Sequence, residues 1–510
     1  MENKVVKKRR GILDFIETVG NKLPHPATIF IFLCMGIIIL SAVLSNMGVS
    51  VTYTGLDRTT NEIKEMTATV TSLLSSDGIR YMFKSLITNF TSFAALGTVL
   101  VAMLGVGVAE GTGLIGTSLK SLVSKTPKSL ITVVVVFAGV MSSIASDAGY
   151  VVLIPLGAVV FLSFGRHPLA GIAAAFAGVS GGFSANLLPG PTDALLAGIT
   201  TEGAKIINPE YAVSVTANWF FLIVSTFLIT IIGTIITEKV VEPRLGEYKP
   251  KTSEKSINMI GLTLKEKRGL KFAGIFLLIG LIIIVALVLP ESGILRNPET
   301  KEILKSPFMD SIVVTIAFLF LISGIGYGIG VGTIKNDKDV INQMGKTMST
   351  MGGYIVLVFF ASQFVAFFSH SNLGTVIAVK GSEFLKSTGI SGIPLLIGFV
   401  IVTAFINLFM GSASAKWAIM APVFVPMLLR MGISPEFTQM AYRIGDSTTN
   451  IISPLMTYFA LIVSFSEKYD KESGIGTMIS TMVPYSLALL VGWTTLLIIW
   501  YAVGLPLGIY

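Results

Sequence analysis

Eleven long apolar segments constrain what this chain can fold into. A transmembrane helix needs about 20 apolar residues, and each of these segments is at least that long. Only 13% of the 510 residues are charged, whereas soluble domains carry about 25%, so we predict an all-α integral membrane protein. The segments cover residues 27–49, 83–109, 129–164, 169–200, 216–237, 270–290, 310–333, 347–368, 391–430, 438–464 and 477–505.

Two of the segments are too long for a single crossing. Segments 129–164 and 391–430 each carry serines and a charged residue near the middle, so we interpret them as re-entrant hairpins that enter and leave the membrane on the same side. About nine transmembrane helices then remain. The first segment, 27–49, is too long for a signal peptide and lacks a clear cleavage site, so we expect the chain to retain it.

The loop charges predict the orientation of the chain. With the N-terminus inside, the cytoplasmic segments hold 24 of the 37 lysines and arginines, and nine of these lie in the loop 238–271. Cytoplasmic loops are enriched in Lys and Arg, so we predict a multi-pass protein of the inner (cytoplasmic) membrane with a cytoplasmic N-terminus. The same loops account for the net charge of +8, and no nucleic-acid partner is expected.

The two halves of the chain present the same features in the same order. Each half has a hairpin with a serine-rich tip, a short turn with a proline, and then a span interrupted at an asparagine. Asn186 and Pro189 in the first half correspond to Asn450 and Pro454 in the second. Since the two hairpins open from opposite sides of the membrane, we predict an inverted repeat with a binding site where the halves meet.

The most polar stretch at membrane depth is residues 443–454. It places a guanidinium, a carboxylate, four hydroxyls and a carboxamide between apolar flanks. Polar groups at this depth usually mark a ligand site or an ion pathway, and a proline obstructs the preceding helical turn. We therefore predict an interrupted helix here and another around a Pro-Gly-Pro turn in the first half. The predicted helix-breaking prolines are Pro189, Pro191, Pro435 and Pro454.

Three charged residues of these stretches are candidates for binding. Arg443 and Asp446 are three residues apart and share one helix face. Arg443 suits a bidentate clamp on a substrate carboxylate, and Asp446 suits a carboxylate that couples transport to a proton or a cation. The alternative is an internal ion pair that holds the bundle together. Asp193 fits a helix cap and an ion-coupling role equally well.

Oxygen-bearing side chains gather at the hairpin tips and at the interruptions. Hydroxyl and carboxamide oxygens suit a hard cation such as Na⁺, and we predict such a site near Asn186, Asp446 and Asn450. Helix capping is the alternative for each of these side chains. The candidates are Ser184, Asn186, Ser412, Ser414, Thr448 and Asn450, and the first hairpin tip adds Ser142, Ser143 and Ser146.

Charged and aromatic residues at the hairpin tips add further chemistry. Trp417 suits stacking on an aromatic ligand, and its alternative is a place at the membrane interface. Lys416 suits either a substrate carboxylate or an acidic side chain of the protein. Asp147, at the first tip, is a charge partner of the same kind.

The sequence argues against several other functions. His25, His167 and His370 all lie at predicted membrane edges, so a metal centre, His-based catalysis and an intramembrane hydrolase lack support. The sequence has no glycine-rich phosphate loop followed by Lys-Ser/Thr, which argues against ATP-driven transport. A channel needs a continuous polar stripe, whereas the polar residues here gather at two tips and two interruptions. We expect no cofactor apart from a coupling ion.

Several motifs resemble the p-aminobenzoyl-glutamate transporter (AbgT) family, and the similarity covers nearly the whole chain. The motifs are Gly20-Asn-Lys-Leu-Pro-His-Pro26, Pro189-Gly-Pro-Thr-Asp193, Gly411-Ser-Ala-Ser-Ala-Lys-Trp417 and Tyr442-Arg-Ile-Gly-Asp-Ser447, followed by Asn450 and Pro454. The chain carries the residue type that the family has at its functional positions, which fall on Asp193, Ser414, Trp417, Pro435, Arg443, Asp446 and Pro454.

The resemblance implies nine transmembrane helices with two re-entrant hairpins, a bowl-like homodimer, and elevator-type movement of a transport domain against a scaffold. On that scheme residues 1–26 form a cytoplasmic N-terminal segment. The scaffold comprises 27–128, 201–390 with the loop 238–271, and 466–510. The transport domain comprises the first hairpin and broken helix, 129–200, and the second hairpin and broken helix, 391–465.

The function implied by the resemblance is import of p-aminobenzoyl-glutamate, a folate catabolite, coupled to Na⁺ or H⁺. The charged and aromatic residues of the predicted site agree with such a ligand, because the ligand has two carboxylates and a flat ring. The alternative is proton-driven export of sulfonamides, which share the aminophenyl ring. The expected substrate-binding residues are Ser414, Lys416, Trp417, Arg443 and Asn186, and the expected ion-coupling residues are Asp193, Asp446, Ser412, Thr448 and Asn450.

Overall fold

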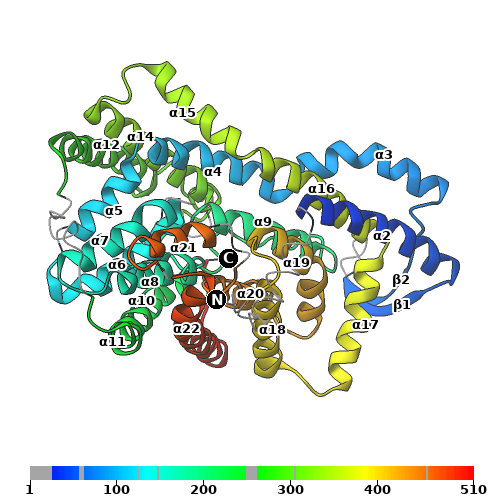
Figure 1. Ribbon diagram of the computed structural model, residues 1–510. Coiled ribbons are helices and arrows are strands. Elements are labelled where there is room, and N and C mark those ends of the chain that lie inside the picture. The colour runs from blue at the N-terminus through cyan, green and yellow to red at the C-terminus, as the bar shows by residue number, and fades with distance from the viewer. Residues whose placement is uncertain are drawn as a thin grey trace, which may run out of the picture.

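The computed structural model describes residues 24, 26–56, 63–124, 126–145, 149–248, 261–303, 306–454, 456, 458–471 and 473–509. Within these residues the chain is mostly helical (Figure 1), and its one sheet is the antiparallel pair β1 (Ser50–Leu56) and β2 (Ile63–Thr69). Ser146 and Asp147 of the first hairpin tip lie outside the described residues. So do the basic N-terminal segment and the middle of the predicted cytoplasmic loop.

Seven helical segments of the described chain are long and apolar enough to cross a membrane. They are α2 (Pro26–Asn46), α3 (Ser76–Thr91) with α4 (Ala94–Gly111), α10 (Trp219–Ile236) with its extensions η5 (Thr237–Val241) and α11 (Glu242–Leu245), α12 (Leu264–Val288), α14 (Ile312–Val331), α16 (Gly352–His370) and α22 (Ile475–Val503). These segments correspond to seven of the nine predicted transmembrane helices. The other two are the spans that were predicted to be interrupted.

Both predicted interruptions are present. The first separates α8 (Pro168–Phe176) and its π-helical end η4 (Ala177–Gly181) from α9 (Pro191–Lys205), and the second separates α20 (Pro435–Asn450) from α21 (Phe459–Glu467). Pro189 and Pro454 lie inside the interruptions, and Pro191 begins α9. Pro435 does not break a helix as predicted, because it lies in the first turn of α20, where a missing N–H removes no helical hydrogen bond.

The two predicted hairpins have separate arms. The first hairpin consists of α6 (Ile131–Met141), η2 (Ser142–Ala145), η3 (Gly149–Leu153) and α7 (Ile154–Ser163). The second hairpin consists of α18 (Gly392–Asn407) and α19 (Ala413–Arg430). At 1.5 Å per residue, α6 is about 16 Å long, roughly half of the ~30 Å hydrocarbon core. The α-helical part of this arm is therefore too short to cross the membrane by itself, which agrees with a re-entrant hairpin.

The remaining helices connect these parts. They are α5 (Leu114–Ser124), η1 (Lys128–Leu130), α13 (Pro307–Asp310), α15 (Asp337–Thr350) and α17 (Leu373–Ser387). The axis bends by 119° between α17 and α18. The bend separates α17 from the second hairpin, so the two helices do not form one straight span.

The helices pack in groups around the two interruptions. α14 packs on α12 and on α4, and α16 packs on α2 and α3. α10 and α22 pack on each other, α10 also packs on α6, and α22 also packs on α20. The boundaries predicted from the sequence place α10 and α22 in the scaffold, and in the structure α10 contacts the first hairpin through α6 and α22 contacts the second broken helix through α20. The two halves meet where α9 packs against α19 and α20, near the middle of the molecule (Figure 1).

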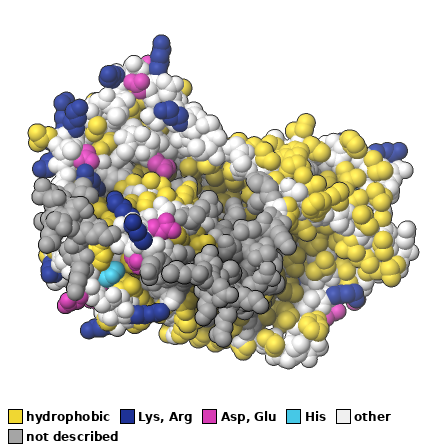
Figure 2. Space-filling view, viewed as in Figure 1, with side chains coloured by type: hydrophobic (Ala, Val, Ile, Leu, Met, Phe, Trp, Pro, Cys, Tyr) yellow, Lys and Arg dark blue, Asp and Glu magenta, His cyan; other side chains and the backbone are white. Residues whose placement is uncertain are grey.

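The outer surface of the described chain is strongly apolar. Figure 2 shows hydrophobic side chains spread over the face around α2 and α16, with lysines and arginines gathered mainly at the margins. Exposed side chains on α2 and α3 include Phe32 at 57% and Phe83 at 81%. Apolar patches of this extent are rare on soluble monomers and suit contact with lipid.

Close packing of α4 on α14 depends on Gly105. A Cβ atom placed on Gly105 would lie 1.9 Å from the carbonyl oxygen of Ala317 in α14. A Cβ atom placed on Gly97 of the same helix would meet nothing within 4 Å. Small residues let helix backbones approach closely inside membranes, so Gly105 sets the distance between these two spans.

Gly105→Ala should lower the melting temperature of the detergent-solubilised protein, because the α14 backbone would have to move away from α4. Overpacking of this kind costs about 1–3 kcal/mol. Gly97→Ala is the matched control and should leave the melting temperature unchanged. Equal melting temperatures for the two variants would contradict the close approach of the two helices.

Candidate functional site

Two buried ion pairs organise the region where the halves meet. Lys416 Nζ lies 2.6 Å from Asp446 Oδ1, and Arg443 pairs with Asp193. None of these four side chains is more than 6% exposed. From the sequence, an ion pair between Arg443 and Asp446 on one face of a helix was one of the two interpretations. In the structure each of these two residues pairs with a residue on a different helix.

The Arg443–Asp193 pair joins α20 to the beginning of α9. Asp193 Oδ2 accepts a hydrogen bond of 2.7 Å from the N–H of Gly190, so Asp193 caps the helix, one of the two roles that the sequence offered. Arg443 Nη2 donates to Asp193 Oδ1, and Nη1 donates to Asn218 Oδ1 at 3.5 Å. The guanidinium is therefore bound by side chains of the first half of the chain.

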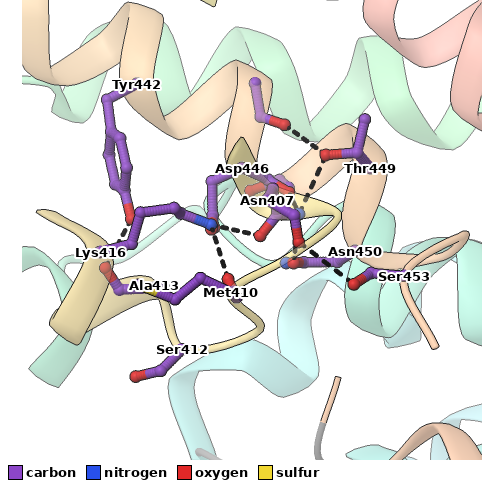
Figure 3. Close-up of polar contacts among 12 residues, drawn as sticks. Asn407, Met410, Ser412, Ala413, Lys416, Tyr442, Asp446, Thr449, Asn450 and Ser453 are labelled. Atoms are coloured by element: carbon purple, nitrogen blue, oxygen red, sulfur yellow. Dashed lines mark hydrogen bonds and ion pairs between the residues drawn. The ribbon is translucent and has the colours of Figure 1, made fainter. Parts of the chain in front are cut away.

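Lys416, Asn407 and Asp446 form a buried polar cluster at the second hairpin tip (Figure 3). Lys416 Nζ donates to Asp446 Oδ1, to Asn407 Oδ1 and, at 3.4 Å, to the carbonyl oxygen of Met410. Asn407 Nδ2 lies 2.7 Å from the carbonyl oxygen of Asp446 and 2.9 Å from Asn450 Oδ1. The cluster thus joins the end of α18 to the end of α20, beside the second interruption.

Asn407 is the residue of this cluster that the sequence analysis missed. It is a carboxamide in the apolar first arm of the second hairpin, which was the one available signal. Its partners Asp446 and Asn450 are 39 and 43 positions away in sequence. Spacing along the chain could not reveal these contacts, because they depend on how α18 packs against α20.

The cluster offers oxygen atoms to a proton or a cation. Asp446 Oδ2 is buried and has no hydrogen-bond partner among the described residues. A buried polar atom without a partner is costly, and a carboxylate oxygen can offset that cost by binding a proton or a hard cation. Asn450 lies in the cluster, whereas Thr448 Oγ1 donates to the carbonyl oxygen of Ile444 within α20.

Asn186, the third residue of the predicted Na⁺ site, is held at the first interruption. Its Nδ2 donates to Ser143 Oγ at 2.9 Å, and its Oδ1 accepts from the N–H of Leu187 at 2.8 Å. Ser184 lies close by, and its N–H donates to Ser447 Oγ at 3.2 Å. These bonds fasten the first hairpin tip to the first interruption and the interruption to α20.

Trp417 packs between helices and does not line the cavity described below. Its side chain is fully buried, so it does not lie at the membrane interface, which was the alternative. The ring stacks on Tyr442 with centroids 4.4 Å apart, and Nε1 donates to Thr200 Oγ1 at 2.9 Å. Trp417 therefore packs α19 against α20 and α9, and joins the two halves of the chain.

A cavity of about 260 Å³ lies between the hairpin tips and the interruptions. Three predicted site residues line it, Ser412, Ser414 and Asn450, whereas Lys416, Trp417 and Arg443 are not among its lining residues. Among the residues that the structure describes, none of those lining the cavity is charged. They are Tyr150, Phe183, Thr192, Leu195, Leu196, Gly411, Ser412, Ala413, Ser414, Asn450, Met456 and Tyr458.

Two helices begin at this cavity. Ser412 is the N-cap of α19, and Thr192 lies in the first turn of α9. Helix N-termini carry partial positive charge and favour anionic groups. The cavity therefore suits a ligand that carries carboxylate or amide oxygens together with an apolar group. A larger cavity of about 780 Å³ has a mainly apolar lining from α5, α12 and α14, to which the first tip adds Ser142 and the first interruption adds Pro189.

Asp193→Asn should lower the melting temperature of the detergent-solubilised protein. Asparagine can still cap α9, but it leaves the buried Arg443 without its counter-charge, and breaking a buried pair in this way costs about 3–5 kcal/mol. Combining it with Arg443→Gln should restore part of the loss, because no uncompensated charge remains.

The matched control is Asp77→Asn, which removes an acid from an exposed pair with Arg80. This variant should melt at the wild-type temperature, because exposed pairs contribute little to stability. A double variant that is no more stable than Asp193→Asn would show that the two residues do not interact in the protein.

Comparisons with known proteins agree with this architecture. The model of the "AbgT putative transporter family" matches residues 11–510. The p-aminobenzoyl-glutamate transport protein of Escherichia coli (strain K12) is 40% identical over 497 residues, which cover 98% of this chain and 96% of that protein.

Two solved structures are also similar over nearly the whole chain. The Alcanivorax borkumensis YdaH transporter is 49% identical with a TM-score of 0.89, covering 95% of this chain and all of that one. Neisseria gonorrhoeae MtrF, described as illuminating a class of antimetabolite efflux pumps, is 49% identical with a TM-score of 0.90, covering 97% of this chain and 98% of that one. This chain therefore belongs to the AbgT family of membrane transporters.

Proposed function

We propose that this chain is an ion-coupled secondary transporter that imports p-aminobenzoyl-glutamate across the cytoplasmic membrane. The name of the Escherichia coli relative supports this substrate. The single observation that carries the proposal is the cavity between the two tips and the two interruptions. Secondary transporters of this kind place substrate sites where interrupted helices from two repeats meet.

The substrate carboxylates are assigned to the beginning of α19. Arg443 was the candidate clamp, but its pair with Asp193 and its place outside the cavity lining favour a structural role. Ser412 and Ser414 offer hydroxyl donors beside the positive end of α19. Hydroxyls and helix N-termini together bind carboxylates without a charged side chain. In this scheme Arg443 holds the wall of the cavity in place by fastening α9 to α20.

The coupling ion is assigned to the Asp446 cluster. Asp446 Oδ2 is the oxygen of this cluster without a hydrogen-bond partner among the described residues. Asn407 Oδ1 and Asn450 Oδ1 lie beside it and accept from Lys416 and Asn407, and Asn450 also lines the substrate cavity. One residue shared between ion cluster and cavity provides a direct route for coupling. The ion is Na⁺ or H⁺, and the same cluster suits both, because Asp446 is able to bind either.

The mode of movement and the assembly follow from the family resemblance. We assign the hairpins and interrupted helices to a moving transport domain in a homodimer, with an inner-membrane location and a cytoplasmic N-terminus. The packing of α10 and α22 against α6 and α20 supports including these two helices in the moving body. α12, α14 and α16 then belong to the static scaffold.

The second candidate function is proton-driven export of sulfonamides. The similarity to Neisseria gonorrhoeae MtrF and its description as an antimetabolite efflux pump favour this alternative. Sulfonamides share the aminophenyl ring of the first candidate but lack its two carboxylates. The direction of net flux under an imposed gradient distinguishes the two functions.

The test is uptake of radiolabelled p-aminobenzoyl-glutamate into proteoliposomes that contain the purified full-length protein. A Na⁺ gradient and a pH gradient are imposed separately, and each is then collapsed with an ionophore. Accumulation above the external concentration that one gradient drives and its ionophore abolishes supports coupled import. Gradient-driven extrusion of a sulfonamide without such uptake would overturn import in favour of export.

Asp446→Asn should remove the dependence of uptake on the ion gradient, because the amide can neither bind a proton at neutral pH nor neutralise a cation. Accumulation should fall to the level reached by equilibration, as measured in the same vesicles. Asp77→Asn, an exposed substitution of the same type, should behave like the wild type. Unchanged gradient dependence in Asp446→Asn would rule out this residue as the coupling group.

A further inference from the structure

The lining of the substrate cavity contains both polar and aromatic side chains. Ser412, Ser414 and Asn450 supply hydroxyl and carboxamide groups, whereas Tyr150 and Tyr458 supply aromatic rings. The two tyrosine rings stack with centroids 4.5 Å apart and an angle of 15° between their planes. They come from opposite halves of the chain, since Tyr150 lies in η3 of the first hairpin and Tyr458 directly precedes α21.

No other stacked aromatic pair of the described chain has both of its rings in the lining of the cavity. Trp417 and Tyr442 also stack, but both are fully buried and neither lines the cavity. The remaining aromatic residue of the lining is Phe183, which is not a member of any ring pair in the described chain. The tyrosine stack is therefore the paired aromatic surface of the cavity, beside the single ring of Phe183.

We propose that Tyr150 and Tyr458 form the subsite for the ring of an aromatic acyl or sulfonyl substrate. The inference rests on the proposed function for the choice of ligand, but it concerns residues that the sequence analysis did not select. It replaces Trp417, which was the expected aromatic contact and is occupied by packing. The serine hydroxyls and the beginning of α19 then bind the polar end of the same ligand.

The geometry of the stack matches this role. A ring that packs parallel to the stacked pair extends the stack by one layer, and offset parallel packing is a favourable arrangement for aromatic rings. The polar groups and the tyrosines line the same cavity, so a ligand of ring plus amide plus carboxylate can contact both. An aliphatic acyl group of the same charge lacks the stacking contact, which makes the tyrosines a source of selectivity.

A purely structural role would give a different result. If the stack only held the two halves together, its loss would lower the stability of the protein and weaken all ligands alike. If it binds the ring, its loss would weaken aromatic ligands and leave aliphatic ligands of equal charge unchanged. The ratio of the two affinities is therefore the informative quantity.

The experiment measures binding and uptake with the full-length protein. N-benzoyl-glutamate and N-acetyl-glutamate compete with radiolabelled p-aminobenzoyl-glutamate in proteoliposomes, and the binding of both is also measured by calorimetry in detergent. The variants are Tyr458→Leu and Tyr150→Leu, with Tyr458→Phe and Tyr150→Phe as conservative counterparts. Tyr501→Leu is the control, because Tyr501 pairs with Phe437 and does not line the cavity.

We expect each leucine variant to weaken the benzoyl ligand by about 2- to 10-fold per ring removed, with the acetyl ligand unchanged. The phenylalanine variants and Tyr501→Leu should retain the wild-type ratio. Leucine variants that weaken both ligands equally, or neither, would overturn the subsite.

Failure of the proposed function has a separate signature. If the wild type does not accumulate p-aminobenzoyl-glutamate but its calorimetric preference for the benzoyl ligand disappears in Tyr458→Leu, the subsite stands and the substrate assignment fails. A wild type without any preference for the benzoyl ligand overturns the subsite, whatever the transport result. Melting temperatures identify any variant that fails to fold, and the phenylalanine variants keep the comparison available in that case.

Discussion

Charged groups inside a membrane protein must find their counter-charges within the protein, because hydrocarbon offers no solvation. This requirement governs the centre of the structure. Lys416 is paired with Asp446 and Arg443 with Asp193, and all four side chains are almost completely buried. Each pair joins two different helices, so the positions of α9, α19 and α20 are set by the need to bring these charges together.

The interruptions are possible for the same reason. An opened helix exposes backbone groups that need partners at membrane depth, and here nearby side chains supply some of them. Asp193 caps the N–H of Gly190, Asn186 caps the N–H of Leu187, and the hydroxyl of Ser447 accepts from the N–H of Ser184. The polar side chains near the first interruption thus provide hydrogen-bond partners for part of its backbone without a ligand. The cavity beside them is left with hydroxyls, one carboxamide and aromatic rings.

The sequence predicts the positions of helices and interruptions better than it predicts which side chains contact one another. Apolar length identifies the spans and hairpins, and proline chemistry places the interruptions within a few residues, because these are local properties of the chain. Proline alone cannot distinguish a break from a helix start, which is why Pro435 was misassigned. Partners depend on packing between distant helices, so the pairing of Arg443 with Asp193, the place of Asn407 and the burial of Trp417 could not be inferred from spacing.

The links between the halves have a mechanical consequence. The Arg443–Asp193 pair joins α9 of the first broken helix to α20 of the second broken helix. The hydrogen bond from Trp417 to Thr200 joins α9 to α19 of the second hairpin. Sliding one half past the other would sever these desolvated bonds, whereas shifting both together leaves them intact. The displacement that keeps these bonds therefore moves the cavity and the carboxylate of Asp446 as one rigid body. In the proposed mechanism, where Asp446 binds the coupling ion, substrate and ion would cross the membrane on the same moving body.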